Sequence, residues 1–326
     1  MNGSGDDGGD SDGDDGDHTQ NKQQVVSRVV QLSIFRIAGY GPWTLTLGSD
    51  REHALQMLQA ALYREAQQLL SERGCLLFQN RGDELVALST GLDLDGHAAI
   101  RDLLSSRFDV PVRVSIGRGP TPAAADRAAH SALATKAETL STPPATTKTT
   151  TTTVEGRSGL NRAPDGNGLV FGPAGREPRP GQVTIMHMDV DGLSHRRASP
   201  YETSLLIFGL YHKMSAFFYE LESLAFFMGG DNFMIAASDE AVGAARKFVD
   251  MTDRQDGIRL NCGIGRGDTG REAARLATES LDMIRRMRGD GDGDGGDDPA
   301  TAHAAARPDK KKAGPRVYEH ATRTHL

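Results

Sequence analysis

The sequence predicts an α+β protein built from two copies of one unit, each an antiparallel sheet with helices on one face. Two short matches indicate the duplication. Gly82-Asp83 recurs as Gly230-Asp231, and the Ile-Gly-Arg-Gly stretch of residues 116–119 recurs at 264–267. Both matches are separated by 148 residues. The order of expected elements also repeats, since each copy reads strand, helix, two strands, helix, strand, helix. This order favours a sheet that leaves one face free to cover its twin.

The first copy is expected over residues 25–140. An apolar, β-branched stretch over residues 25–37 predicts a strand, and the glycines and proline of residues 39–44 predict a loop after it. Leucines at helical spacing predict a helix over residues 50–73, which Gly74 ends. The remaining elements are a hairpin over 76–88, a helix over 95–107, a strand over 112–116 and a helix over 122–140.

The second copy is expected over residues 183–288. Its elements are a strand over 183–189, a helix over 201–222, a hairpin over 224–238, a helix over 239–252, a strand over 258–264 and a helix over 270–288. Three stretches fall outside the two units: we expect a disordered acidic tail over residues 1–24, a low-complexity linker over 141–182, and a polar insertion with a short C-terminal strand over 289–326.

The charge of the chain is concentrated in two short acidic runs. The formal net charge is −7, but residues 1–17 hold seven aspartates and residues 289–298 hold five, so the remainder carries about +5 (−7 + 12). This mildly basic body shows no cluster of Lys and Arg of the kind that binds nucleic acid. Two cysteines exclude a disulfide framework. No apolar stretch is long enough to cross a bilayer, so we expect a cytoplasmic protein with no membrane partner.

A glycine-rich turn in the second copy is the main candidate for a functional site. The turn Gly229-Gly230-Asp231-Asn232 joins two apolar runs, and its glycines allow the backbone to approach a ligand closely. Upstream, a strand ends at Asp189. If the two strands are neighbours, Asp189 and Asp231 converge at one end of the sheet, where paired carboxylates suit Mg²⁺ held jointly with substrate phosphates. The alternative is that the turn only closes a hairpin.

Several motifs resemble archaeal GTP cyclohydrolase III. They are Gly-Tyr-Gly-Pro-Trp-Thr at 39–44, the glutamine and leucine pattern over 55–63, Thr90-Gly91 with His97, His187-Met188-Asp189, and the stretch over 226–232. The resemblance implies tandem ferredoxin-like domains related to nucleotidyl-cyclase palms. It also implies a Mg²⁺-dependent hydrolase of flavin or deazaflavin biosynthesis, which opens the guanine imidazole ring of GTP to a formylamino-pyrimidinone ribosyl monophosphate and releases phosphates. We expect GTP as the partner and a homo-oligomer.

Ring opening and phosphate release suggest roles for individual residues. Asp189 and Asp231 would hold the metal, and Asp83 would do so more weakly in the first copy. Gly229 and Gly230 would bring the backbone close to the nucleotide, while Asn232 offers an amide to a phosphate or base.

Two further residues are candidates for contact with the substrate. His187 shares a strand face with Asp189. A lone histidine on a strand is usually structural, but the family resemblance implies a role in proton transfer or substrate contact. Trp43 would stack on a base or fill a gap between the two copies.

The first copy departs from the family pattern. Ala38-Gly39 stands where the family has Asp-Asn, and an alanine cannot ligate a metal. The first hairpin reads Arg-Gly-Asp-Glu over residues 81–84 instead of Arg-Phe-Asp-Asn. We therefore expect the second copy to carry the metal site, with one site shared by both copies as the alternative. Two other interpretations remain: a cyclase that makes a cyclic dinucleotide from GTP, and a non-catalytic GTP-binding paralogue.

Overall fold

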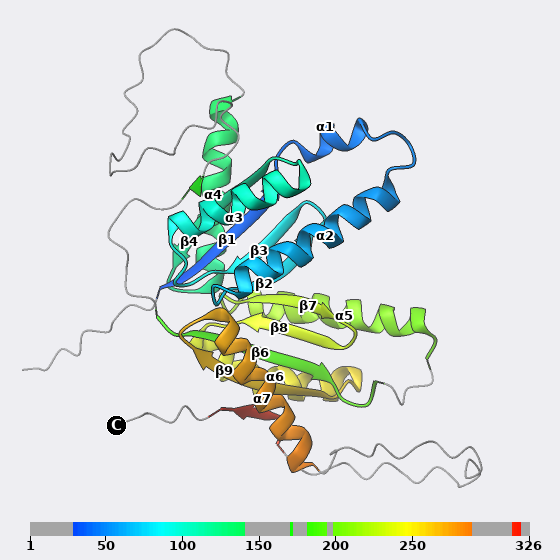
Figure 1. Cartoon of the computed structure of the whole chain (residues 1–326). Coiled ribbons are helices and arrows are strands. Elements are labelled where there is room, and N and C mark those ends of the chain that lie inside the picture. The colour runs from blue at the N-terminus through cyan, green and yellow to red at the C-terminus, as the bar shows by residue number, and fades with distance from the viewer. Residues whose placement is uncertain (1–28, 141–169, 172–180, 194–197, 289–314, 321–326) are drawn as a thin grey trace, which may run out of the picture.

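The computed structural model describes residues 29–140, 170–171, 181–193, 198–288 and 315–320. The acidic tail, most of the linker and most of the C-terminal insertion that the sequence predicts lie outside these residues. Within them the two repeats lie one above the other (Figure 1), and each is built on a five-stranded sheet. The strand orders are β2-β3-β1-β4-β5 and β10-β9-β6-β8-β7, so the predicted duplication and the α+β class are confirmed.

The first repeat runs from β1 to α4. Its elements are β1 (Val30–Ile37), α1 (Tyr40–Leu45), α2 (Glu52–Ser71), β2 (Leu76–Arg81), β3 (Glu84–Leu88), α3 (Leu94–Phe108), β4 (Val112–Gly119) and α4 (Pro122–Leu140). These four strands pair antiparallel, and the short β5 (Val170–Phe171) adds a parallel edge to β4.

The second repeat runs from β6 to α7 and repeats this pattern. Its elements are β6 (Val183–Val190), α5 (Pro200–Tyr219), β7 (Leu224–Gly229), β8 (Asn232–Ala236), α6 (Asp239–Asp256), β9 (Leu260–Gly267) and α7 (Gly270–Met287). The expected C-terminal strand forms as β10 (Val317–Glu319), which pairs parallel with β9. None of the described helices is long and apolar enough to span a membrane.

Residues 39–44, which the sequence predicts as a loop, instead enter a short helix, α1. Gly39 precedes it in the left-handed region at φ 66°, a conformation that glycine adopts without strain. Pro42 lies in the first turn, where a helix has no use for the missing N–H. Tyr40 and Trp43 pack against the core of the first repeat. This packing stabilises the helix, and the glycines and the proline of the local sequence do not predict it.

The last helix of each repeat, α4 or α7, lies on the opposite face of its sheet from the two long helices before it, whereas the sequence predicts all helices on one face. Helices α2 and α3 cover the outer face of the first sheet, and α5 and α6 cover that of the second. Helix α7 crosses the inner face of the second sheet on a row of glycines, and a Cβ at Gly263 would lie only 2.1 Å from the Ala277 carbonyl oxygen. The same contact fixes α4, where a Cβ at Gly117 would lie 2.0 Å from the Ala125 carbonyl oxygen. Glycine is required because the helix backbone rests directly on the strand.

The two inner faces share one hydrophobic core. Leu32, Ile34 and Phe78 of the first repeat pack in one cluster with Ile185 and Phe226 of the second. The rings of Phe78 and Phe226 stack with centroids 3.9 Å apart. The repeats are therefore fixed face to face.

Loops at equivalent positions reinforce this contact on both sides. The Arg271 amide donates to the Gly74 carbonyl oxygen at 3.0 Å, and the Ala123 amide donates to the Glu222 carbonyl oxygen at 3.2 Å. Each pair joins the helix-to-strand loop of one repeat, α2–β2 or α5–β7, to the first turn of the last helix of the other repeat, α7 or α4.

Candidate functional site

The second repeat brings a strand end and a hairpin turn together on the inner face of its sheet. Alternate side chains of β6 point to this face, so His187 and Asp189 both lie on it. Strand β8 pairs with β6 so that Asn232 stands opposite Asp189, and the Val190 amide donates to the Asp231 carbonyl oxygen at 3.3 Å. The structure thus places Asp189 and Asp231 at the same end of the sheet, as the sequence predicts.

The hairpin turn beside Asp189 is open. Gly229 and Gly230 have φ angles of 104° and 62°, which an L side chain rarely adopts. A Cβ on either glycine would meet no atom within 4 Å. The backbone of this turn is therefore accessible to a ligand.

A chain of hydrogen bonds holds Asp231 from the side of α7. The Asn232 Nδ2 group donates to Asp231 Oδ1 at 2.8 Å, which turns the Asn232 carbonyl oxygen toward His187. The His187 Nε2–H donates to that oxygen at 3.1 Å, and His187 Nδ1 lies 3.0 Å from the Thr278 hydroxyl oxygen. Burial lowers the pKa of His187, although the Asn232 hydrogen bond and the Asp189 charge offset part of this effect. The ring is therefore neutral at pH 7.

Both ring nitrogens of His187 have partners inside the protein. The sequence suggests proton transfer to the substrate by this histidine, but neither nitrogen is free to face one in this arrangement. His187 is instead linked by hydrogen bonds to Asn232, and Asn232 to Asp231.

Asp189 is the most deeply buried carboxylate of the site, with only 5% of the residue exposed. Its Oδ2 accepts a hydrogen bond from Arg285 Nη2 on α7 at 2.7 Å, while its Oδ1 is buried without a hydrogen-bond partner. A buried carboxylate oxygen without a partner is costly unless a cation or donor meets it. Asp189 Oδ1, beside Asp231, therefore fits a metal ion.

The described residues contain no group of three or more His, Cys, Asp or Glu side chains that could hold a metal. This finding is compatible with Mg²⁺, which takes one or two carboxylates and completes its shell with water and substrate phosphates.

Asp191, in contrast, forms ion pairs with three arginines. Arg288 Nη2, Arg316 Nη1 and Arg259 Nε lie 3.0, 3.5 and 3.7 Å from its Oδ2. Burial alone would raise the pKa of Asp191, but the Arg288 hydrogen bond and the three positive charges outweigh it and lower the pKa. This carboxylate holds the strand end to α7 and to the segment before β10.

The hydrogen bonds of the two repeats identify their equivalent residues. The Ala38 amide donates to the Pro111 carbonyl oxygen, and the Asp191 amide donates to the Arg259 carbonyl oxygen. The two acceptor residues, 111 and 259, are separated by the repeat spacing of 148. Ala38 therefore corresponds to Asp191. The position that corresponds to Asp189 is two residues earlier in β1 and holds Arg36.

An ion pair occupies the place of the carboxylate site in the first repeat. Arg36 pairs with Glu84, which stands where the second repeat has Asn232, and Asn80 Nδ2 donates to the other Glu84 oxygen at 2.7 Å. Arginine supplies a fixed positive charge and no metal-ligating oxygen. Arg36 thus takes the position of Asp189 in this repeat, and Ala38 takes the position of Asp191, the carboxylate that the arginines hold in the second repeat.

Asp83 differs from Asp231 in its surroundings. Both of its carboxylate oxygens accept hydrogen bonds from Arg81, at 2.9 and 2.8 Å. The turn is closed as well, because a Cβ at Gly82 would lie 2.5 Å from the amide nitrogen of Gln59 on α2. The structure therefore does not present Asp83 as a ligand in the way it presents Asp231.

Trp43 lies away from the carboxylates. It is half-buried on α1 against the outer core of the first repeat, with its ring centroid 5.9 Å from that of Tyr40. The Tyr40 hydroxyl in turn accepts a hydrogen bond from Gln59 at 2.6 Å. The structure does not bring Trp43 together with His187, Asp189 and Asp231.

Two residues of the site, Thr278 and Arg285, were missed from the sequence. They are seven residues apart on α7 and so lie on one helix face, the face that covers the inner side of the sheet. The spacing of seven residues on α7 was the available signal, because it places both side chains along the edge of a buried face made mostly of Ala, Leu and Ile. The equivalent position of the first repeat, 148 residues earlier, holds His130 of α4, so the two repeats differ at Thr278.

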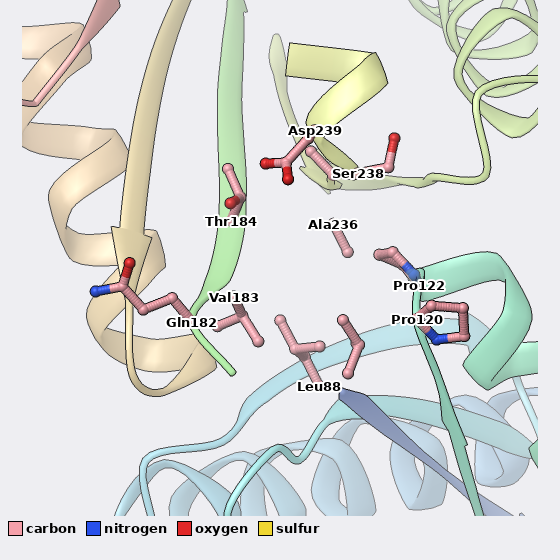
Figure 2. Close-up of a pocket in the computed structure, with 11 residues that line it drawn as sticks. Leu88, Pro120, Pro122, Gln182, Val183, Thr184, Ala236, Ser238 and Asp239 are labelled. Carbon is pink, nitrogen blue, oxygen red and sulfur yellow. The ribbon is translucent and has the colours of Figure 1, made fainter. Parts of the chain in front are cut away.

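A small cavity lies at the other end of the interface between the repeats. Figure 2 shows its lining, which includes Leu88 and Pro120 of the first repeat and Thr184, Ser238 and Asp239 of the second. Thr184 is near the start of β6, whereas Asp189 is near its end. The cavity is therefore separate from the carboxylate pair.

A model of the GTP cyclohydrolase III family matches residues 31–157 and 167–293 of the chain, and so covers both repeats. The chain is 29% identical over 260 residues to the GTP cyclohydrolase III of Methanothermobacter thermautotrophicus, which aligns 79% of this chain and 95% of the relative. It is also 29% identical over 261 residues to that of Methanocaldococcus jannaschii, covering 79% of this chain and 88% of the relative.

Solved structures with lower similarity come from cyclase-type proteins. A sensory box/GGDEF family protein from Caulobacter crescentus aligns with 32% of this chain and 79% of its own, at a TM-score of 0.28 and 18% identity. A bacterial light-regulated adenylyl cyclase aligns with 80% of this chain and 83% of its own, at a TM-score of 0.30 and 7% identity. These overlaps are too low to support an argument about this chain.

Proposed function

Because the chain belongs to the GTP cyclohydrolase III family, we propose that it opens the imidazole ring of GTP at the Asp189–Asp231 end of the second repeat. One water adds at the ring carbon between the two imidazole nitrogens, the bond from that carbon to one nitrogen breaks, and the carbon becomes the formyl group. Each terminal phosphate leaves with the uptake of one further water. The product is 2-amino-5-formylamino-6-ribosylamino-4(3H)-pyrimidinone 5′-phosphate.

The observation that carries this proposal is the buried, unpaired Oδ1 of Asp189 next to the open Gly229-Gly230-Asp231 turn. Asp189 and Asp231 would hold Mg²⁺ there. When bound jointly with substrate phosphates, the ion would offset their negative charge. Arg285, already at Asp189, adds a positive charge at the same end of the sheet.

The glycine turn would orient the nucleotide. Gly229 and Gly230 leave room for the substrate to approach the backbone, and backbone N–H groups that point at phosphates bind them well. Asn232 uses one amide hydrogen on Asp231 and keeps the second for the substrate.

His187 would act through Asn232. A neutral, buried ring held by Thr278 on one side fixes the rotamer of Asn232 on the other, and this fixes the Asp231 carboxylate. Trp43 packs against the outer core of the first repeat, so its location supports neither stacking on the base at this site nor filling a gap between the two repeats.

Incubation of the purified chain with GTP and Mg²⁺, followed by mass spectrometry of the products, tests the proposal. We expect the formylamino-pyrimidine monophosphate and inorganic phosphate, and on the order of 100-fold less product or lower from Asp231→Asn. A cyclic dinucleotide would instead support the cyclase interpretation. GTP that binds and is recovered unchanged would support a non-catalytic paralogue.

A further inference from the structure

Three arginines of the second repeat converge on one carboxylate oxygen. The guanidinium groups of Arg259, Arg288 and Arg316, which we call the arginine cluster, all lie within 3.7 Å of Asp191 Oδ2. They come from three elements, since Arg288 caps the C-terminus of α7, Arg259 directly precedes β9 and Arg316 directly precedes β10. Helix α7 lies beside β10 at this side of the sheet (Figure 1).

The charges of this group do not balance. Asp191 contributes one negative charge against the three positive charges of the cluster, which leaves an excess of two. The nearby Asp189 does not correct this excess, because it is paired with Arg285. The C-terminus of α7 carries a partial negative charge of about half a unit, which offsets only part of it. Like charges held this close repel one another, so an anion with two negative charges would stabilise the cluster.

Arg288 is the deepest member of the cluster and has an unused donor. Its side chain is only 1% exposed. Nη1 donates to Asn261 Oδ1 at 2.6 Å and Nη2 donates to Asp191 Oδ2 at 3.0 Å, but Nε is buried without a hydrogen-bond partner among the described residues. A buried donor without a partner is costly. Because Nε and Nη2 form one edge of the guanidinium group, a second acceptor oxygen beside Asp191 Oδ2 would complete the pair.

The other two arginines are accessible to a ligand. The side chains of Arg259 and Arg316 are 28% and 15% exposed. Their nitrogens lie 3.7 and 3.5 Å from Asp191 Oδ2, beyond the usual limit of about 3.2 Å for an N–H···O bond, so charge rather than hydrogen bonding dominates these contacts. A guanidinium group has five N–H donors, and the contact with Asp191 uses few of them.

The corresponding positions of the first repeat lack these charges. Ala38 and Pro111 stand where the second repeat has Asp191 and Arg259. The residue 148 positions before Arg288 is a leucine. The two repeats nevertheless share the same order of strands and helices. The fold itself therefore does not require the arginine cluster, which favours a role in binding.

We propose that the arginine cluster binds a phosphoryl group. Phosphate supplies two negative charges, and its oxygens match the paired donors of guanidinium groups. The choice of phosphate among the oxyanions rests on the function proposed above, because GTP and its products bring phosphates to this end of the sheet. The phosphoryl group has two sources in that reaction, namely the terminal phosphate of bound GTP and the inorganic phosphate that is released.

The arginine cluster lies next to the carboxylate pair. Asp189 and Asp191 are two residues apart, which corresponds to about 7 Å along a strand. Arg285 and Arg288 are about one turn apart on α7 and bond to these two carboxylates in the same order. A triphosphate held at Asp189 is therefore able to reach the arginine cluster with its outer phosphates.

Isothermal titration calorimetry with inorganic phosphate, in buffer without GTP and Mg²⁺, tests the proposal without reference to turnover. We expect the wild type to bind phosphate, and Arg316→Gln and Arg259→Gln each to weaken binding by at least about tenfold in Kd. Arg286→Gln is the control, because Arg286 is exposed on the same turn of α7, and it should bind as the wild type does. Asp191→Asn removes a negative charge that competes with the ligand, so it should bind phosphate more tightly.

A second titration distinguishes the two sources of the phosphoryl group. It uses 7-deaza-GTP and 7-deaza-GMP with Mg²⁺, because these analogues lack the imidazole nitrogen needed for ring opening. If the cluster holds the terminal phosphate of the nucleotide, inorganic phosphate competes with 7-deaza-GTP, and Arg316→Gln weakens binding of the triphosphate but not of the monophosphate. If it holds the released phosphate, both ligands bind together and Arg316→Gln leaves the affinity for the triphosphate unchanged.

The proposal would be overturned if neither the wild type nor Asp191→Asn bound phosphate. Equal phosphate binding by the wild type, Arg316→Gln and Arg259→Gln would overturn it as well, because the anion would then lie elsewhere. Circular dichroism shows whether each variant is folded, and should Arg316→Gln unfold, Arg259→Gln decides. A chain that binds phosphate at the cluster but leaves GTP unopened would refute the proposed function alone, whereas a chain that opens GTP without binding phosphate would refute this site alone.

Discussion

His97 should make the protein less stable as the pH falls. Its side chain is 0% exposed on α3, where Nδ1–H donates to the Asp93 carbonyl oxygen at 2.6 Å. Its Nε2 accepts from the Ser33 hydroxyl at 2.6 Å, and Ser33 in turn bonds Ser89. Burial lowers the pKa of His97 from its ordinary 6.5 to about 4, despite the opposing contribution of Asp93.

The sign follows from which state takes up the proton first. The unfolded chain protonates His97 near its ordinary pKa, whereas the folded chain does so only near pH 4. The stabilisation is therefore complete above the ordinary pKa and is lost as the pH falls toward 4. One pKa unit corresponds to about 1.4 kcal/mol, so the full loss is about 3 kcal/mol, of which about 2 kcal/mol has occurred by pH 5.

Urea unfolding at pH 7 and pH 5, followed by circular dichroism, measures this effect. The free energy of unfolding of the wild type should fall by about 2 kcal/mol more between these pH values than that of His97→Gln, which cannot titrate. His53→Gln is the control, because the His53 side chain is 67% exposed, and it should behave as the wild type. Equal losses in wild type and His97→Gln would refute the reasoning.

Two further predictions concern α7. Gly263→Ala should lower the free energy of unfolding by about 1–3 kcal/mol or more, because its Cβ would collide with the Ala277 carbonyl oxygen. Urea unfolding measures this loss. Gly243→Ala on α6 is the control and should show no such loss, because its Cβ would meet no atom within 4 Å. Thr278→Val should reduce turnover of GTP by roughly 10–100-fold with an unchanged unfolding midpoint, since it releases the histidine that orients Asn232. A change in midpoint without a change in turnover would contradict this positioning role.

The fold was predictable to the extent that local patterns decide it. The repeat spacing and the apolar periodicity gave the strands and the long helices. The sheet face that α4 and α7 cover was not predictable in this way, because it depends on glycines such as Gly263, which leave no side chain between strand and helix. Helix α1 was missed because its stability comes from the packing of Tyr40 and Trp43, which lies outside any local pattern.

The site was predictable in its carboxylates and less so in its surroundings. The positions of Asp189 and Asp231 follow from a strand end and a hairpin turn. The degeneracy of the first repeat was expected from Ala38, but the strand register assigns it to Arg36, a residue whose partner Glu84 is on another strand. Arg285 reaches Asp189 from a helix almost a hundred residues away, so no local signal could show the pair.

The central claim is that the second repeat alone holds the metal site, and turnover of GTP as a function of Mg²⁺ concentration tests it most directly. The pair to compare is Asp231→Asn and Asp83→Asn, matched positions in the two repeats. We predict a loss on the order of 100-fold or more for Asp231→Asn, because an amide replaces a metal-binding carboxylate. We predict no more than a few-fold loss and an unchanged Mg²⁺ dependence for Asp83→Asn, whose carboxylate is already held by Arg81. Equal losses in the two variants would contradict the claim, because both repeats would then contribute to one shared site.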